Sequence, residues 1–160
     1  MENSQAFTLF PELALALAGF AGIAATFGGK NRTYDPAEKE RLIGLFVISA
    51  STIAISVLTI ALFSAGLIAA TVYFWASCFA LLTQIRMVLL FSKVIRFISD
   101  PSASTTLKVT VFLFTPIVTS WVLFIGNVIV WQQEWPLIVA LTLQLLGGLF
   151  LFLRLLTTRN

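Results

Sequence analysis

Five long apolar stretches fill most of this chain, and almost all of its positive charges gather in alternate gaps between them. A helix that crosses a hydrocarbon core roughly 30 Å thick needs about 20 residues. The stretches are Leu9–Phe27, Leu42–Phe63, Leu67–Phe91, Leu107–Val130 and Leu137–Leu153. Hydrophobic residues make up 59% of the sequence and charged residues 11%, too few to coat a water-soluble domain. We therefore expect an all-α integral membrane protein, with five transmembrane helices packed as one compact bundle and one domain over residues 1–160.

The basic residues predict the orientation of these helices. The first gap, the third gap with the adjoining ends of its stretches, and the chain end hold Lys30, Arg32, Lys39, Arg41, Lys93, Arg96, Lys108, Arg154 and Arg159. The links Ser64–Gly66 and Trp131–Pro136 hold no lysine or arginine. Because basic loops stay in the cytoplasm, the N-terminus should lie outside and the C-terminus inside, in a multi-pass protein of the bacterial inner membrane. The first stretch lacks a basic leader and a small-residue cleavage motif, so we expect a retained span and not a signal peptide.

Two prolines mark expected helix starts. Asp35 can cap a helix whose first residue is Pro36, and Glu38 stands where a capping box needs it. Pro136 suits the first turn of the last helix, and the tryptophans beside it suit a membrane interface.

A hydroxyl stripe runs along the second stretch, with spacings of three, four and three residues. Its members are Ser49, Thr52, Ser56 and Thr59. Such spacing places them on one side of a helix. The stripe can be packing surface, since these hydroxyls can bond their own backbone, or it can be the wall of a pore. With Gln84 and Arg86 near the inner end of the third stretch, these residues are the pore-lining candidates.

Side-chain amides are costly in lipid unless they are paired. Gln84, Asn127 and Gln144 should therefore face the bundle interior or another subunit. Small residues let helices approach closely, and the first stretch carries them every four positions, at Ala14, Ala18, Gly22 and Thr26. This face predicts close packing against a neighbour, with a ligand-facing groove as the alternative.

Charged residues near the spans have both structural and functional interpretations. Glu12 is the acid within an apolar stretch, and it can serve as a proton acceptor or cation ligand or simply occupy a first helical turn. Arg86, Lys93 and Arg96 share one helical face. That basic face predicts contact with anionic lipid at the cytoplasmic leaflet or, around an oligomer axis, an inner mouth that favours anions. Pro116 predicts a kink in the fourth helix, which is either static or a hinge.

The sequence argues against enzyme chemistry. It has no histidine and one cysteine, Cys78, so the usual haem ligand, transition-metal ligand and general base are missing. We expect no cofactor and no metal site. The net charge of +3 follows the membrane topology and does not indicate nucleic-acid binding.

Three functions remain, led by a small homo-oligomeric pore or ion channel in which several copies surround the path. The second is a non-conducting structural or assembly subunit that binds another membrane protein through its small-residue faces. The third is a small proton-coupled transporter that uses Glu12.

Overall fold

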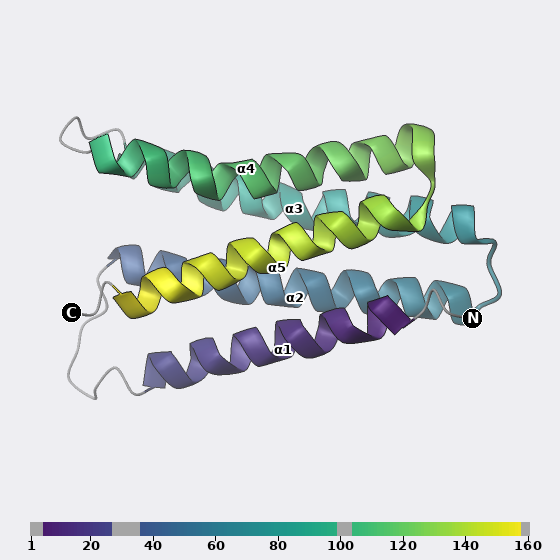
Figure 1. The fold of residues 1–160 in the computed structure, drawn as a ribbon, viewed down its shortest axis with the longest axis horizontal. Coiled ribbons are helices and arrows are strands. Elements are labelled where there is room, and N and C mark those ends of the chain that lie inside the picture. The colour runs from purple at the N-terminus through teal and green to yellow at the C-terminus, as the bar shows by residue number, and fades with distance from the viewer. Residues whose placement is uncertain (1–4, 27–35, 99–103, 158–160) are drawn as a thin grey trace.

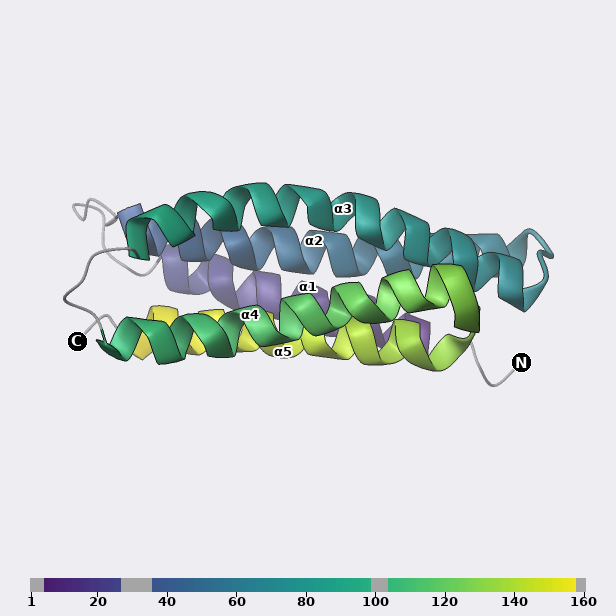
Figure 2. The same ribbon diagram turned by 90° about the horizontal axis from the view of Figure 1, so that it is seen from above.

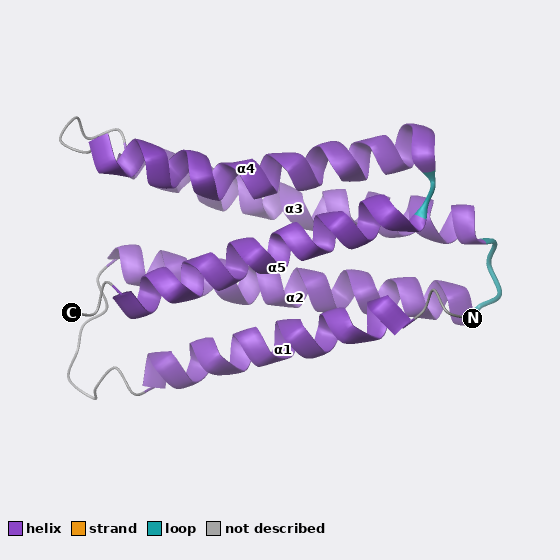
Figure 3. Ribbon diagram, viewed as in Figure 1, coloured by secondary structure: helices purple, strands orange, loops and turns teal. Residues whose placement is uncertain are grey.

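The computed structural model describes residues 5–26, 36–98 and 104–157, and these ranges are helical apart from two short links (Figure 3). The helices are α1 (Gln5–Thr26), α2 (Pro36–Ser64), α3 (Ala69–Ile98), α4 (Ser104–Gly126) and α5 (Glu134–Thr157). A five-residue π-helix, η2 (Asn127–Trp131), continues from the end of α4. The expected all-α architecture with five helices is confirmed for these residues.

Successive helices run in alternating directions, so α1 begins at the opposite end of the bundle from the last turn of α5 (Figure 1). α2 and α3 lie beside each other, and α4 and α5 pack against them (Figure 2). α1 packs along α2 and α5.

Three helices contain apolar segments long enough to cross a membrane, namely Gln5–Ile23, Arg41–Ser64 and Glu134–Leu153. Within the described side chains, α3 and α4 contribute the shorter apolar segments Ala69–Ile85 and Thr115–Trp131. The bundle also carries large apolar side chains on its outside, including Ile68, Leu82 and Ile129. An apolar exterior of this kind is compatible with a lipid surrounding, as expected for helices long and apolar enough to cross a membrane.

Two expected helix starts are confirmed, and one is wrong. α2 begins at Pro36, and Pro136 lies in the first turn of α5. α1 begins at Gln5, so Glu12 lies two turns inside the helix and not in its first turn. The earlier start has a physical reason, because it places the fully buried Phe7 on the inward face of α1.

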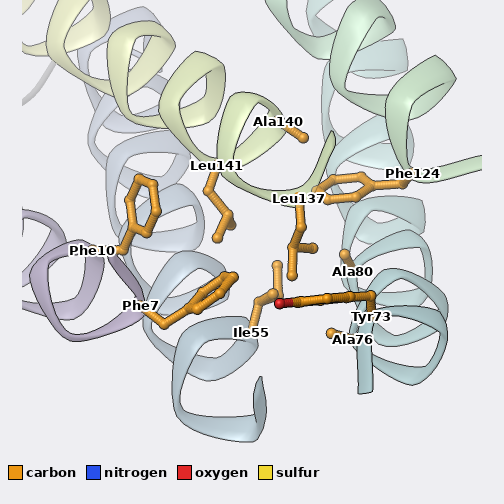
Figure 4. Packing of buried hydrophobic residues seen from close by; sticks show 10 residues of the cluster. All are labelled: Phe7, Phe10, Ile55, Tyr73, Ala76, Ala80, Phe124, Leu137, Ala140 and Leu141. Carbon is orange, nitrogen blue, oxygen red and sulfur yellow. The ribbon is translucent and has the colours of Figure 1, made fainter. Parts of the chain in front are cut away.

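The buried apolar side chains form two clusters. The first apolar cluster draws on all five α-helices near the beginning of α1 (Figure 4). Its members are Phe7, Phe10, Ile55, Tyr73, Ala76, Ala80, Phe124, Leu137, Ala140 and Leu141. The second apolar cluster, nearer the other end, comes from α1, α2 and α5. It consists of Leu17, Ala21, Leu45, Ile48 and Leu151. The bundle therefore has apolar packing at two levels along its axis.

Close contacts fix the register between the antiparallel helices α2 and α5. A Cβ on Gly148 would lie 3.2 Å from Ile48 Cγ2 and 2.8 Å from Leu17 Cδ2, so three helices meet there. A Cβ on Gly44 would lie 3.5 Å from Leu151 Cδ1, one turn farther along. Ile55 and Leu141 share the first apolar cluster on the other side. Residue numbers therefore increase along α2 in the direction in which they decrease along α5.

Candidate functional site

The hydroxyl stripe of α2 points into the bundle. Ser49 is 1% exposed, and Thr52, Ser56 and Thr59 are each 0% exposed. α2 packs against α1, α3 and α5, so neighbouring helices of the same chain cover these side chains. As packed in this bundle, the stripe faces the interior of one subunit and not an axis between subunits.

The hydroxyls of this stripe differ in their hydrogen bonding. Thr59 Oγ1 donates to the backbone carbonyl of Ile55 over 2.8 Å. Ser49 Oγ, Thr52 Oγ1 and Ser56 Oγ have no hydrogen-bond partner among the described residues. A hydroxyl that is taken out of water and left unpaired costs free energy, so these three groups are unusual in a folded interior.

Gln144 on α5 is buried as well, at 8% exposure. Neither its Nε2 nor its Oε1 has a hydrogen-bond partner within the described part of the chain. The register places it opposite Thr52, because Gln144 lies between Leu141 and Gly148 while Thr52 lies between Ile55 and Ile48. Here an amide and a hydroxyl therefore stand at the same level on facing helices.

We name Ser49, Thr52, Ser56 and Gln144 the interior polar cluster. Ser49 and Ser56 lie about one turn to either side of Thr52, so the cluster extends roughly 10 Å along α2. The second apolar cluster lies beyond one end of it, and the first apolar cluster surrounds the other. Leu145, next to Gln144, packs against both. The arrangement is a layer of unpartnered polar side chains between two apolar layers.

The unpartnered hydroxyls predict that removing one of them stabilises the protein. Thr52→Val keeps the side-chain shape and removes a stranded polar group, so it should raise the free energy of unfolding by about 1 kcal/mol. Thr59→Val is the matched control, because its hydroxyl is bonded to a carbonyl of its own helix, and its effect should stay within about 0.5 kcal/mol. Thermal unfolding in detergent measures both. A destabilised Thr52→Val protein would show that this hydroxyl is paired after all.

Asn127 forms a second polar centre, in which both polar atoms of the side chain have a hydrogen-bond partner. It is 0% exposed, and its Nδ2 donates to Ser77 Oγ on α3 over 2.9 Å. Its Oδ1 accepts the backbone N–H of Gln133 at 2.9 Å, and its carbonyl accepts that of Gln132 at 3.1 Å. One side chain thus ties the α4–α5 link to α3. These bonds make Asn127 a structural residue.

The π-helix that contains Asn127 was not expected from the sequence. It ends at Trp131 and is capped by Gln132, whose φ of 48° is the left-handed conformation. The Trp131 ring lies over Gly126, where a Cβ would be 2.5 Å from Trp131 Cζ3. Trp131 and Trp135 pack with ring centroids 5.0 Å apart. The glycine before Asn127 is a local signal for this turn, since a larger residue leaves no room for the indole.

Pro116 lies within α4, one turn before Ser120, whose hydroxyl contacts α5. Ser120 Oγ shares its single hydrogen between the carbonyl of Pro116, at 2.7 Å, and that of Ala140, at 3.2 Å. The proline itself provides no N–H for the carbonyl one turn earlier. This hydroxyl therefore joins the two helices one turn after the proline. The hinge interpretation stays a prediction.

The remaining candidates do not share one site. Gln84 is buried at 3% exposure, which confirms that the amides Gln84, Asn127 and Gln144 face inward. Glu12 is exposed on α1. Arg86, Lys93 and Arg96 belong to α3, but their side chains lie outside the described part of the structure.

The small-residue face of α1 is only partly the one expected. Ala14 is fully buried, Ala18 and Gly22 are half-buried, and Thr26 is exposed. Ala21, which falls outside the four-residue spacing, is fully buried in the second apolar cluster. The face of α1 that packs against α2 and α5 is therefore rotated from the face defined by every fourth residue.

Within the described residues, no group of three or more His, Cys, Asp or Glu side chains is placed to hold a metal ion. What the site offers is uncharged hydrogen-bonding chemistry on two facing helices. The chain matches no protein-family model, no curated protein and no solved structure.

Proposed function

We propose that this protein is a small membrane carrier or gated conduit that moves a small polar solute through the interior of its own bundle. The single observation that carries the proposal is the interior polar cluster, whose buried hydroxyls and amide lack partners in the described part of the chain. In the proposed topology all five helices cross the bacterial inner membrane, with the N-terminus outside and the C-terminus in the cytoplasm.

The absence of internal partners favours transient binding. A side chain that is bonded to its own helix, as Thr59 is, has no free hydrogen for a solute. The hydroxyls of Ser49, Thr52 and Ser56 keep that capacity, and so does the amide of Gln144. Polar groups inside membrane proteins are costly and commonly mark a substrate path. The free-energy cost of leaving them unpaired is offset when a solute takes their bonds.

This proposal differs from an oligomeric pore in where the path lies. Ser49, Thr52 and Ser56 are covered by helices of their own chain, so the path we propose runs within one subunit. Homo-oligomerisation stays part of the proposal as an assembly state, but the copies need not enclose the path. The apolar packing around the polar layer favours a closed resting state over an open channel.

Reconstitution into liposomes tests the proposal. Protein-containing vesicles should take up a small polar solute faster than protein-free vesicles, and Thr52→Val should reduce that uptake severalfold while the protein stays folded. Thr142→Val is the control, because Thr142 is exposed on α5 and its hydroxyl donates to the Ile138 carbonyl. Uptake that is equal in vesicles with and without protein, for ions and uncharged solutes alike, would refute the proposal.

The second candidate is an assembly subunit, and the exposed face of α1 favours it. Glu12 is exposed within a candidate span, where a carboxyl group needs a polar partner. A Cβ on Gly19 or Gly22 would meet nothing within 4 Å, which leaves room for a close helix. A stoichiometric foreign protein that co-purifies in mild detergent and is lost in Gly19→Leu would support this candidate. A clean homo-oligomer would count against it.

Two further roles stay proposals. In a proton-coupled transporter, Glu12→Gln should abolish uptake without unfolding the protein, although Glu12 is exposed and does not join the interior polar cluster. The basic face of Arg86, Lys93 and Arg96 is proposed to contact anionic lipid at the cytoplasmic leaflet.

A further inference from the structure

The interior polar cluster combines donors and acceptors. Each hydroxyl of Ser49, Thr52 and Ser56 can donate one hydrogen bond and accept others, and the Gln144 amide can do both through separate atoms. A ligand that matches such a surface must itself present donors and acceptors. This chemistry is shared by polyols and amides.

The surroundings of the cluster are uncharged. In the described part of the chain, every buried polar side chain is a serine, threonine, asparagine or glutamine. Glu12 is exposed on α1, and Arg41 lies eight residues before Ser49 along α2. An ion that enters this layer would lose its hydration without gaining an opposite charge, which costs far more than burying an uncharged polar group.

The layer is also short and closed by apolar packing. Ser49 and Ser56 are separated by roughly 10 Å along the helix. At one end Gly148 lies so close to Leu17 and Ile48 that an added Cβ would crowd them. At the other end Phe7 and Phe10 belong to the first apolar cluster (Figure 4). A bound molecule must therefore be small.

We infer that the interior polar cluster binds a small uncharged molecule with both donors and acceptors, of the size of glycerol or urea, and that Gln144 determines this specificity. The inference rests on the proposed function and names its substrate class. Gln144 is suited to this role because it faces Thr52 from the opposite helix and is the cluster's only amide.

Vesicle assays with separate solutes test the inference. Stopped-flow light scattering follows glycerol and urea entry, and fluorescent indicators follow K⁺, Na⁺ and Cl⁻ in the same preparation. The protein should speed entry of glycerol or urea and leave ion flux at the protein-free level. Gln144→Leu should reduce the protein-dependent rate about five- to tenfold, the value of one neutral hydrogen bond. Thr142→Val should leave it unchanged.

The outcomes separate this inference from the proposed function. Ion flux that falls in Gln144→Leu would overturn the uncharged class while the conduit itself survives. Solute entry that is unchanged in both Gln144→Leu and Thr52→Val would overturn the assigned cluster. No protein-dependent flux of any solute would remove the proposed function as well. Thermal unfolding of each variant excludes misfolding, because both substitutions remove stranded polar groups and should leave the protein at least as stable as the natural sequence.

Discussion

Replacing Asn127 with alanine should lower the free energy of unfolding by about 2–3 kcal/mol. The change removes the bond to Ser77 Oγ and the bond from the Gln133 N–H, both 2.9 Å long. It also strands the Ser77 hydroxyl, which is fully buried. Thermal unfolding in detergent should show a midpoint roughly 5–10 °C lower.

A double-mutant cycle distinguishes the Asn127–Ser77 bond from simple loss of packing. Ser77→Ala leaves the Asn127 amide without its acceptor, so it should be destabilising by itself. Because both residues share one hydrogen bond, the double variant should lose about 1 kcal/mol less than the sum of the two single changes. Additive effects would mean that the bond contributes nothing. Gln133→Ala serves as control, since its side chain is exposed and bonds only Trp135 among the contacts described here.

Gly148→Leu should destabilise the bundle by about 3 kcal/mol. The first added atom would already stand 2.8 Å from Leu17 Cδ2 and 3.2 Å from Ile48 Cγ2, and the remaining atoms would force α5 away from α1 and α2. Overpacking of this kind cannot be relieved by one rotamer change, because two helices crowd the site together. Chemical or thermal unfolding measures the loss.

The adjacent glycine provides a matched control for this prediction. A Cβ on Gly147 would meet nothing within 4 Å. Gly147→Leu should therefore raise stability by up to about 1 kcal/mol, since leucine favours a helix more than glycine does. Equal effects at the two positions would show that α5 does not approach α1 and α2 as closely as described.

Much of the architecture could be predicted from hydropathy and local capping. Pro36 starts α2 and Pro136 lies in the first turn of α5, because proline at a helix start acts through local geometry alone. The inward direction of Gln84, Asn127 and Gln144 followed from the cost of an amide in lipid. Each of these features depends on one helix and its solvent.

The features that the sequence could not supply depend on pairs of helices. Gln144 stands opposite Thr52 because Gly148 lets α5 contact Leu17 and Ile48 at one height. The hydropathy of the separate helices does not determine the position along their axes at which they meet. The start of α1 at Gln5 likewise depends on where Phe7 packs, which moved Glu12 deeper into the helix than its local signals indicated. The π-helix at Asn127 depends on bonds to Ser77 and Gln133.

In the proposed function, the position of the polar layer between two apolar clusters limits the rate at which a solute passes through the bundle. A molecule could reach Thr52 only after side chains such as Phe7 on one side, or Leu17 and Ile48 on the other, had moved apart. Throughput would then be governed by how often the protein rearranges, since lids and gates commonly move on microsecond to millisecond timescales. The rate of such transport would saturate as the solute concentration rises and would fall steeply on cooling. Diffusion through a permanently open, water-filled pore shows neither behaviour to the same degree.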